Sequence, residues 1–138
     1  MKSSPSSFKL IITGNTNIPS MINVIIRATL QLRENSQRDE LIFRQIHIFH
    51  TEQSLNALTS FSGDWQAVLR QIGIPSTSMV HHVTNLEDSN VDRFRDLVEQ
   101  LKTIVNPLDN AHYYIDLTGG LSSLKSILAV FAYVLGVC

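Results

Sequence analysis

The residues best suited to chemistry in this sequence lie where a short aromatic stretch meets a pair of glycines. Residues 113–117, Tyr-Tyr-Ile-Asp-Leu, are aromatic and β-branched, which favours a buried strand. The glycines at 119–120 let the backbone turn, and the serines at 122–123 can cap an apolar helix over 124–137. Such a junction presents unpaired N–H groups to an anion, most often phosphate. The alternative is an ordinary turn in which the glycines serve only close packing.

A second group of polar side chains follows the first apolar stretch of the chain. Residues 8–13 are almost continuously apolar and end at Gly14, the pattern of a parallel strand covered on both faces. Thr13 and the run Asn15–Asn17 supply short neutral donors and acceptors that suit ribose or phosphate oxygens, or the edge of a base. The same residue types also stabilise ordinary loops, so both interpretations stay open.

The histidines give a weaker indication of a site. His50 and Thr51 follow the second apolar stretch, but a lone histidine is more often packed or solvated than in contact with a ligand. His81 and His82 fall in an expected strand, where neighbours point to opposite faces and cannot bind one metal together. No spacing ties a Ser-His-Asp set together, and the zinc motif HExxH is absent. We therefore expect no metal site and no cofactor.

The elements that must position these residues alternate along the chain. The pattern predicts a strand-helix alternation that is typical of a parallel sheet with helices on both faces. Right-handed crossovers make this a Rossmann-like, three-layer α/β/α fold, which binds ligands at the carboxyl ends of its strands, where the strand order reverses. The expected strands are residues 8–13, 42–49, 78–84 and 113–117, and the expected helices are residues 20–33, a helix capped by Thr51 or Ser54, 64–73, 92–105 and 124–137.

Composition narrows the class of protein. A chain of 138 residues with 43% hydrophobic and 17% charged residues can form one domain with a real core. The net charge of −1 argues against a sequence-independent duplex binder. A single cysteine, Cys138, allows no disulfide framework and fits the reducing cytoplasm. Residues 1–7 form a polar tail, and the apolar run 127–137 is too short to span a bilayer.

With these elements in place, the stretch Tyr114–Leu121 resembles the CARF domains, the CRISPR-associated Rossmann folds. Their signature is a strand that ends in a (D/N)-x-(T/S)-G-G turn before a long helix. The loop Thr13–Asn17 is similar to their other ligand loop, and Ile48–Glu52 is similar to the exit of their second strand. The resemblance extends over roughly the whole chain in topology, while only the Thr-Gly-Gly turn is specific.

The resemblance implies a function and a set of ligand-binding residues. CARF domains bind cyclic oligoadenylates, the messengers of type III CRISPR immunity, as homodimers with the ring across the two-fold axis. We therefore expect a cytoplasmic antiviral sensor that binds such a ring, most readily cyclic tetra-adenylate, and controls an effector. The residues implied at the ligand are Thr13, Gly14, Asn15, Thr16, Asn17, His50, Thr51, Thr118, Gly119, Gly120, Leu121, Ser122, Ser123 and Lys125.

Two departures from the family pattern define the alternatives. Many CARF turns carry a lysine soon after Thr-Gly-Gly, whereas Ser122 stands there in this chain and Lys125 follows further on, which weakens the case for ring cleavage. The family domain continues into further strands and often an effector, so we expect residues 8–138 to be a fragment or a minimal form of a larger protein. The alternatives are a metal-independent ring nuclease and an unrelated Rossmann-like nucleotide-binding domain. The first turn lacks GxGxxG, which counts against NAD.

Overall fold

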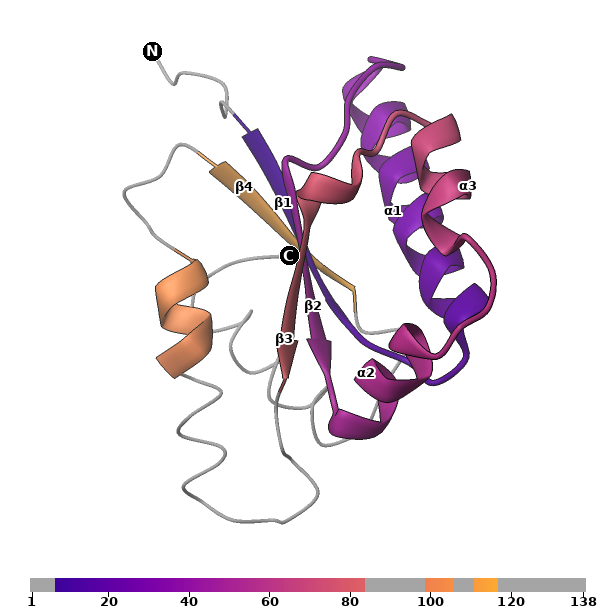
Figure 1. The fold of residues 1–138 in the computed structure, drawn as a ribbon. Helices are drawn as coiled ribbons and strands as arrows, with labels where there is room; N and C mark the ends of the chain where they lie inside the picture. Colours follow the sequence, from indigo (N-terminus) through magenta and orange to yellow (C-terminus); the bar gives the residue numbers. More distant parts are fainter. Residues whose placement is uncertain (1–6, 84–98, 106–110, 117–138) are drawn as a thin grey trace.

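The computed structural model describes residues 7–83, 99–105 and 111–116, and Figure 1 shows how they are arranged. Residues 99–104 form a helical segment that has no label in the figure. The other elements, in chain order, are β1 (Ser7–Thr13), α1 (Ile18–Ser36), β2 (Gln45–His50), α2 (Glu52–Thr59), α3 (Trp65–Gln71), the 3-10 turn η1 (Ser76–Ser78), β3 (Met79–Val83) and β4 (Ala111–Asp116).

The four strands form one parallel sheet in the order β3-β2-β1-β4. The chain passes from β1 to β2 and then to β3 on one side, and returns to place β4 on the other side of β1. The strand order therefore reverses between β1 and β4. Ile12 lies opposite Asp116 in the register, so both strands end at the same edge of the sheet.

Helices cover both faces of the sheet, which confirms the expected Rossmann-like α/β/α architecture. In Figure 1, α1, α2 and α3 lie on one side of the strands and the helical segment 99–104 lies on the other. Alternate residues of β1 divide between the two layers, as a strand requires. Leu10 and Ile12 belong to the core cluster beneath α1, whereas Ile11 belongs to a second cluster with Leu101 and Val105.

Helix α1 is longer than the sequence pattern predicted. Its N-cap is Asn17, whose side chain accepts a hydrogen bond from the Ser20 N–H at 3.2 Å, and Pro19 occupies the first turn, where its missing N–H costs nothing. The helix continues past the expected end at Arg33 to Ser36 and is capped by Gln37, which adopts a left-handed conformation with φ 54°. Gly73, with φ +91°, follows α3 as the predicted glycine stop.

The second strand begins three residues later than predicted. Apolar residues recur from Ile42 to Phe49 with polar residues between them, but the ladder with β1 starts at Gln45. Phe43 is fully buried although it precedes the strand, because the Arg44 N–H donates to the Phe8 carbonyl at 2.8 Å and keeps this segment against β1. Apolar residues therefore begin before the strand does, because the segment that precedes β2 is also buried.

Several predicted features lie outside the described residues. They are the loop 85–91, most of the helix predicted over 92–105, the Thr-Gly-Gly turn and the helix predicted over 124–137. The described end of the helix predicted over 92–105, residues 99–104, is helical as expected. Within the part of the chain that the structure describes, no helix is long and apolar enough to cross a membrane.

Candidate functional site

The loop after β1 is held in place by its own side chains. The Gly14 N–H donates to the Phe49 carbonyl at 2.7 Å, which fixes the loop to the end of β2. Asn15 then accepts a hydrogen bond from the Asn17 N–H at 2.9 Å, and Asn17 caps α1. The loop-stabilising interpretation therefore applies to both asparagine oxygens. Thr16 and Asn17 are exposed at the carboxyl edge of the sheet, where the N-terminus of α1 also lies.

His50 is buried at the end of β2 and joins a chain of polar side chains. Its Nδ1 lies 2.7 Å from Ser54 Oγ, and its Nε2 lies 2.9 Å from Nδ1 of His81. His50 is fully buried and Ser54 is nearly so, whereas His81 is exposed on the edge strand β3. Thr51, the other predicted residue of this segment, caps α2 by accepting a hydrogen bond from the Ser54 N–H at 3.1 Å.

The two predicted ligand segments of β1 and β2 meet at Gly14. A Cβ atom on Gly14 would lie 2.6 Å from Ser54 Oγ and closer still to His50 Nδ1. Ordinary carbon contacts are well above 3 Å, so a side chain cannot fit here without moving its neighbours. The structure therefore places Gly14 directly against the His50–Ser54 pair. Thr13, the last residue of β1, is buried beside them.

Burial keeps His50 neutral. It lowers the pKa of His50 to about 4, and the neighbouring His81 and His82 add to the effect. Burial also lowers the pKa of His81, although that ring is on the sheet edge. A neutral imidazole carries one donor and one acceptor nitrogen, which matches a hydrogen-bond partner at each end of the His50 ring.

A second histidine pair lies on the opposite face of the same two strands. His47 Nδ1 is 2.9 Å from His82 Nε2, and the His82 ring stacks on Phe49 with a centroid distance of 4.8 Å. The prediction that His81 and His82 point to opposite faces is thus confirmed. The described residues contain no group of three or more His, Cys, Asp or Glu side chains that could hold a metal ion.

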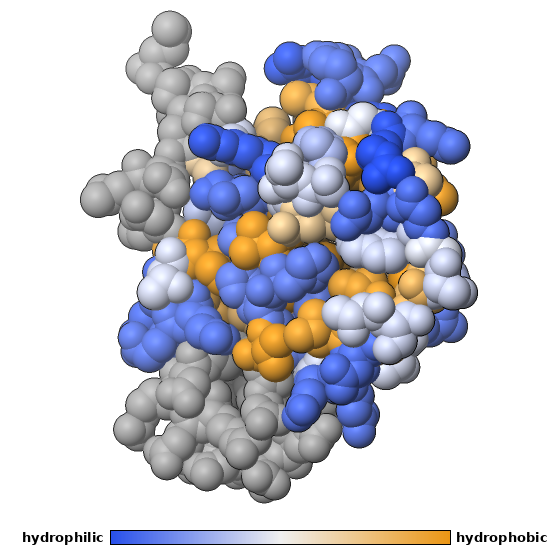
Figure 2. All heavy atoms as spheres, viewed as in Figure 1, coloured by the Kyte–Doolittle hydropathy of each residue, from blue (hydrophilic) through white to orange (hydrophobic). Residues whose placement is uncertain are grey.

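At the edge of the sheet, His81 is exposed and His82 is half-buried. In the view of Figure 2, hydrophilic residues in the middle, where β3 runs in Figure 1, lie between hydrophobic ones. This matches the strand sequence Met-Val-His-His-Val and its alternation of half-buried and exposed positions. Trp65 approaches the His81 ring edge-on, with centroids 6.3 Å apart, so it packs against the same polar chain.

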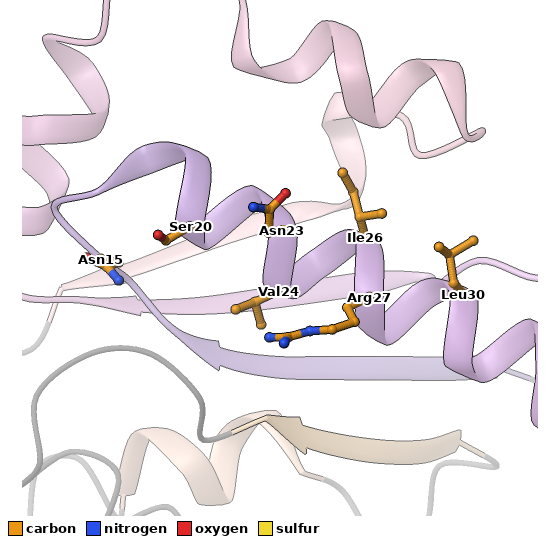
Figure 3. Close-up of a pocket in the computed structure, with 7 residues that line it drawn as sticks. All are labelled: Asn15, Ser20, Asn23, Val24, Ile26, Arg27 and Leu30. Atoms are coloured by element: carbon orange, nitrogen blue, oxygen red, sulfur yellow. The ribbon is translucent and has the colours of Figure 1, made fainter.

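A groove runs from the loop after β1 along the side of α1, as Figure 3 shows. Its volume is about 610 Å³, and the Val24 and Arg27 side chains lie on the side of α1 nearer the strands. A smaller groove of about 220 Å³ lies between α1 and β4 and includes Asp116. Arg27 was not predicted as a site residue from the sequence. Its spacing from Ser20 and Asn23 on one helix face was the available signal. The larger groove is lined by Asn15, Ser20, Asn23, Val24, Ile26, Arg27 and Leu30.

The remaining predicted ligand residues lie beyond the end of β4, outside the described residues. They are Thr118, Gly119, Gly120, Leu121, Ser122, Ser123 and Lys125. The strand that precedes them ends at Asp116, beside the end of β1, where the strand order reverses.

Comparisons with known proteins identify the fold. No protein-family model matches this chain, and no curated protein matches it. Among solved structures, the chain is similar to Enterococcus italicus Csm6 bound to cyclic hexa-2'-fluoro-hexa-dAMP, with a TM-score of 0.61 and 16% sequence identity. The match covers 93% of this chain and 30% of the Csm6 chain, so this chain spans less than a third of that protein. The resemblance to CARF domains is thereby confirmed at the level of the fold.

Proposed function

We propose that this chain is a sensor domain that binds a cyclic oligoadenylate at the carboxyl edge of its sheet. The observation that carries this proposal is the likeness in fold to Csm6, whose solved structure holds a cyclic hexa-adenylate analogue. The likeness covers 93% of this chain. Ligands of open α/β sheets bind where the strand order reverses, and here that point lies between β1 and β4.

The chemistry of the described edge suits a nucleotide. The exposed Thr16 hydroxyl and the Asn17 amide lie beside the N-terminus of α1, whose backbone N–H groups favour a negative charge. The loop is already fixed by its contacts with Phe49 and by its own asparagines, so little ordering accompanies binding. The residues Thr118–Ser123 and Lys125 would supply further phosphate contacts from the segment that follows β4.

A two-fold ring requires a two-fold protein site, so the proposal includes a homodimer with one ring for two chains. Each chain would present its β1 and β4 edge to half of the ring. Control of an effector by the bound ring belongs to the same proposal.

The deciding experiment is a calorimetric titration of the chain with cyclic tetra-adenylate and cyclic hexa-adenylate. Linear oligoadenylates of the same lengths serve as controls, and the recovered nucleotide is sized afterwards. One intact ring per two chains is expected. Recovery of linear product would instead identify a ring nuclease, and binding of neither ring by folded protein would overturn the proposal.

Two lysine variants, one at the proposed site and one away from it, test the proposal further. Lys125→Ala should weaken ring binding about tenfold, because a hydrogen bond to a charged group contributes roughly 1.5–3 kcal/mol. Lys102→Ala is the matched control, because Lys102 is exposed on the helical segment 99–104 and pairs with Glu99 at 3.5 Å. Equal affinities of the two variants for the ring would show that Lys125 does not contact it.

A further inference from the structure

The buried polar pair beneath the loop has no role in the proposed contacts with a ring. His50 is fully buried and Ser54 is 3% exposed, so neither side chain is open to a ligand. A buried imidazole and a buried hydroxyl are costly to keep in a core unless they satisfy each other. Their distance of 2.7 Å shows that they do so, and His81 satisfies the other ring nitrogen at 2.9 Å.

The pair occupies the space that a side chain at position 14 would need. The hypothetical Cβ of Gly14 meets Ser54 Oγ at 2.6 Å, and two atoms of the His50 ring lie within 3.0 Å. Gly14 does not have a positive φ, unlike Gly73, so the glycine is required by space and not by backbone conformation. The backbone of the loop therefore rests on the edge of the imidazole and on the hydroxyl.

This contact is transmitted to the groups that face the ligand edge. Gly14 is followed directly by Asn15, Thr16 and Asn17, and Asn17 caps α1. A shift of the Gly14 backbone away from the sheet would also strain its 2.7 Å hydrogen bond to the Phe49 carbonyl. The position of the loop relative to the sheet thus depends on the His50 and Ser54 side chains that contact Gly14.

We propose that His50 and Ser54 act as positioning residues that set the place of the loop 14–17 for ring binding. This inference rests on the proposed function and adds a mechanism to it. His50 was predicted as a ligand contact. The geometry instead assigns it a position one layer below the contact, with Gly14 between it and the edge.

The second histidine pair provides a matched control within the same strands. His47 is 5% exposed and lies 2.9 Å from His82, and burial lowers its pKa to about 4, as for His50. It lies on the opposite face of the sheet, with Phe49 and not with Gly14. Loss of His47 therefore removes a comparable buried pair without changing what supports the loop.

The test is a double-mutant cycle on ring affinity with whichever cyclic adenylate the unmodified chain binds. Gly14→Ala alone should weaken binding at least tenfold. In the His50→Ala background the ring is gone, and the Ser54 hydroxyl, released from its 2.7 Å partner, can rotate away from the added methyl group, so Gly14→Ala should then change affinity by less than twofold. In the His47→Ala background it should still cost at least tenfold. An equal loss in both backgrounds would overturn the inference.

A second readout separates this inference from the proposed function. Amide hydrogen exchange at Asn15, Thr16 and Asn17 reports the place of the loop without any ligand. Gly14→Ala should speed exchange at these amides several-fold, and His50→Ala, but not His47→Ala, should suppress that effect. If the unmodified chain binds no ring while this pattern holds, the proposed function fails and the positioning role stands. Unchanged exchange would overturn the positioning role.

Discussion

The two histidine pairs of β2 and β3 show how the same local chemistry acquires different consequences on the two faces of one sheet. His50–His81 and His47–His82 have the same nitrogen separation of 2.9 Å and nearly the same ring spacing, 5.1 and 5.2 Å. The first pair continues through Ser54 to the loop after β1, whereas the second continues to Gln45 and stacks on Phe49. The neighbours of a pair, and not its own geometry, therefore decide whether it contacts the loop after β1.

The largest loss of stability should come from acid, because a low pH protonates histidines of both pairs. His47 and His50 have folded-state pKa values of about 4, below the ordinary value of 6.5, so the unfolded chain takes up protons first as the pH falls. The free energy of unfolding should be highest above about pH 6.5. It should fall as the pH is lowered toward 4, by on the order of 2 kcal/mol for each histidine.

Urea unfolding at pH 7.5 and pH 4.5 measures this loss. His47→Gln and His50→Gln should each reduce the difference between the two pH values. A variant with both substitutions that still loses as much stability as the unmodified chain would show that other groups control the acid response.

A smaller effect should follow from Gly14→Ala, which tests only the face that carries the loop. Overpacking against His50 and Ser54 should lower the free energy of unfolding by about 3 kcal/mol. Gly63→Ala is the control, because its nearest neighbour is the movable and partly exposed ring of Phe61 at 3.0 Å, and it should cost roughly 0.5 kcal/mol. Equal losses in chemical denaturation would contradict the close packing beneath Gly14.

The smallest effects separate the outer members of the two pairs. His82→Ala should cost about 2 kcal/mol, because it removes a stacked ring and leaves the buried His47 Nδ1 without that partner. His81→Ala should cost about 1 kcal/mol, because His81 is exposed and water can replace it at the sheet edge. Thermal unfolding of the two variants measures the difference, and the reverse order would break the comparison.

The order of strands and helices along the described part of the chain could be predicted from the sequence. The end of α3 at Gly73 has a local cause and was predicted from the sequence, whereas Asn17 was predicted only as a ligand residue and not as the cap of α1. The opposite directions of His81 and His82 followed from strand alternation alone.

The pairing of the histidines could not be predicted, because it depends on the register between β2 and β3. Ile48 lies opposite His81 and Phe49 opposite His82, and a shift of one residue would exchange the faces. The contact of Gly14 with His50 likewise needs β1 and β2 to be neighbours. Long-range placement of this kind leaves no periodic signal in the sequence, and neither does the buried Phe43 that precedes β2.

The central position of β1 has a consequence for the speed of recognition. The strand is paired along both sides, with β2 and with β4, so the loop at its end starts from one of the two inner strands of the described sheet. Under the proposed function, a ring that meets the fixed loop after β1 does not wait for a slow conformational step of that loop. We expect stopped-flow binding traces with a single phase whose rate rises linearly with ring concentration. The duration of the signal would then be governed by how long the ring stays bound, and not by how quickly the sensor can be loaded.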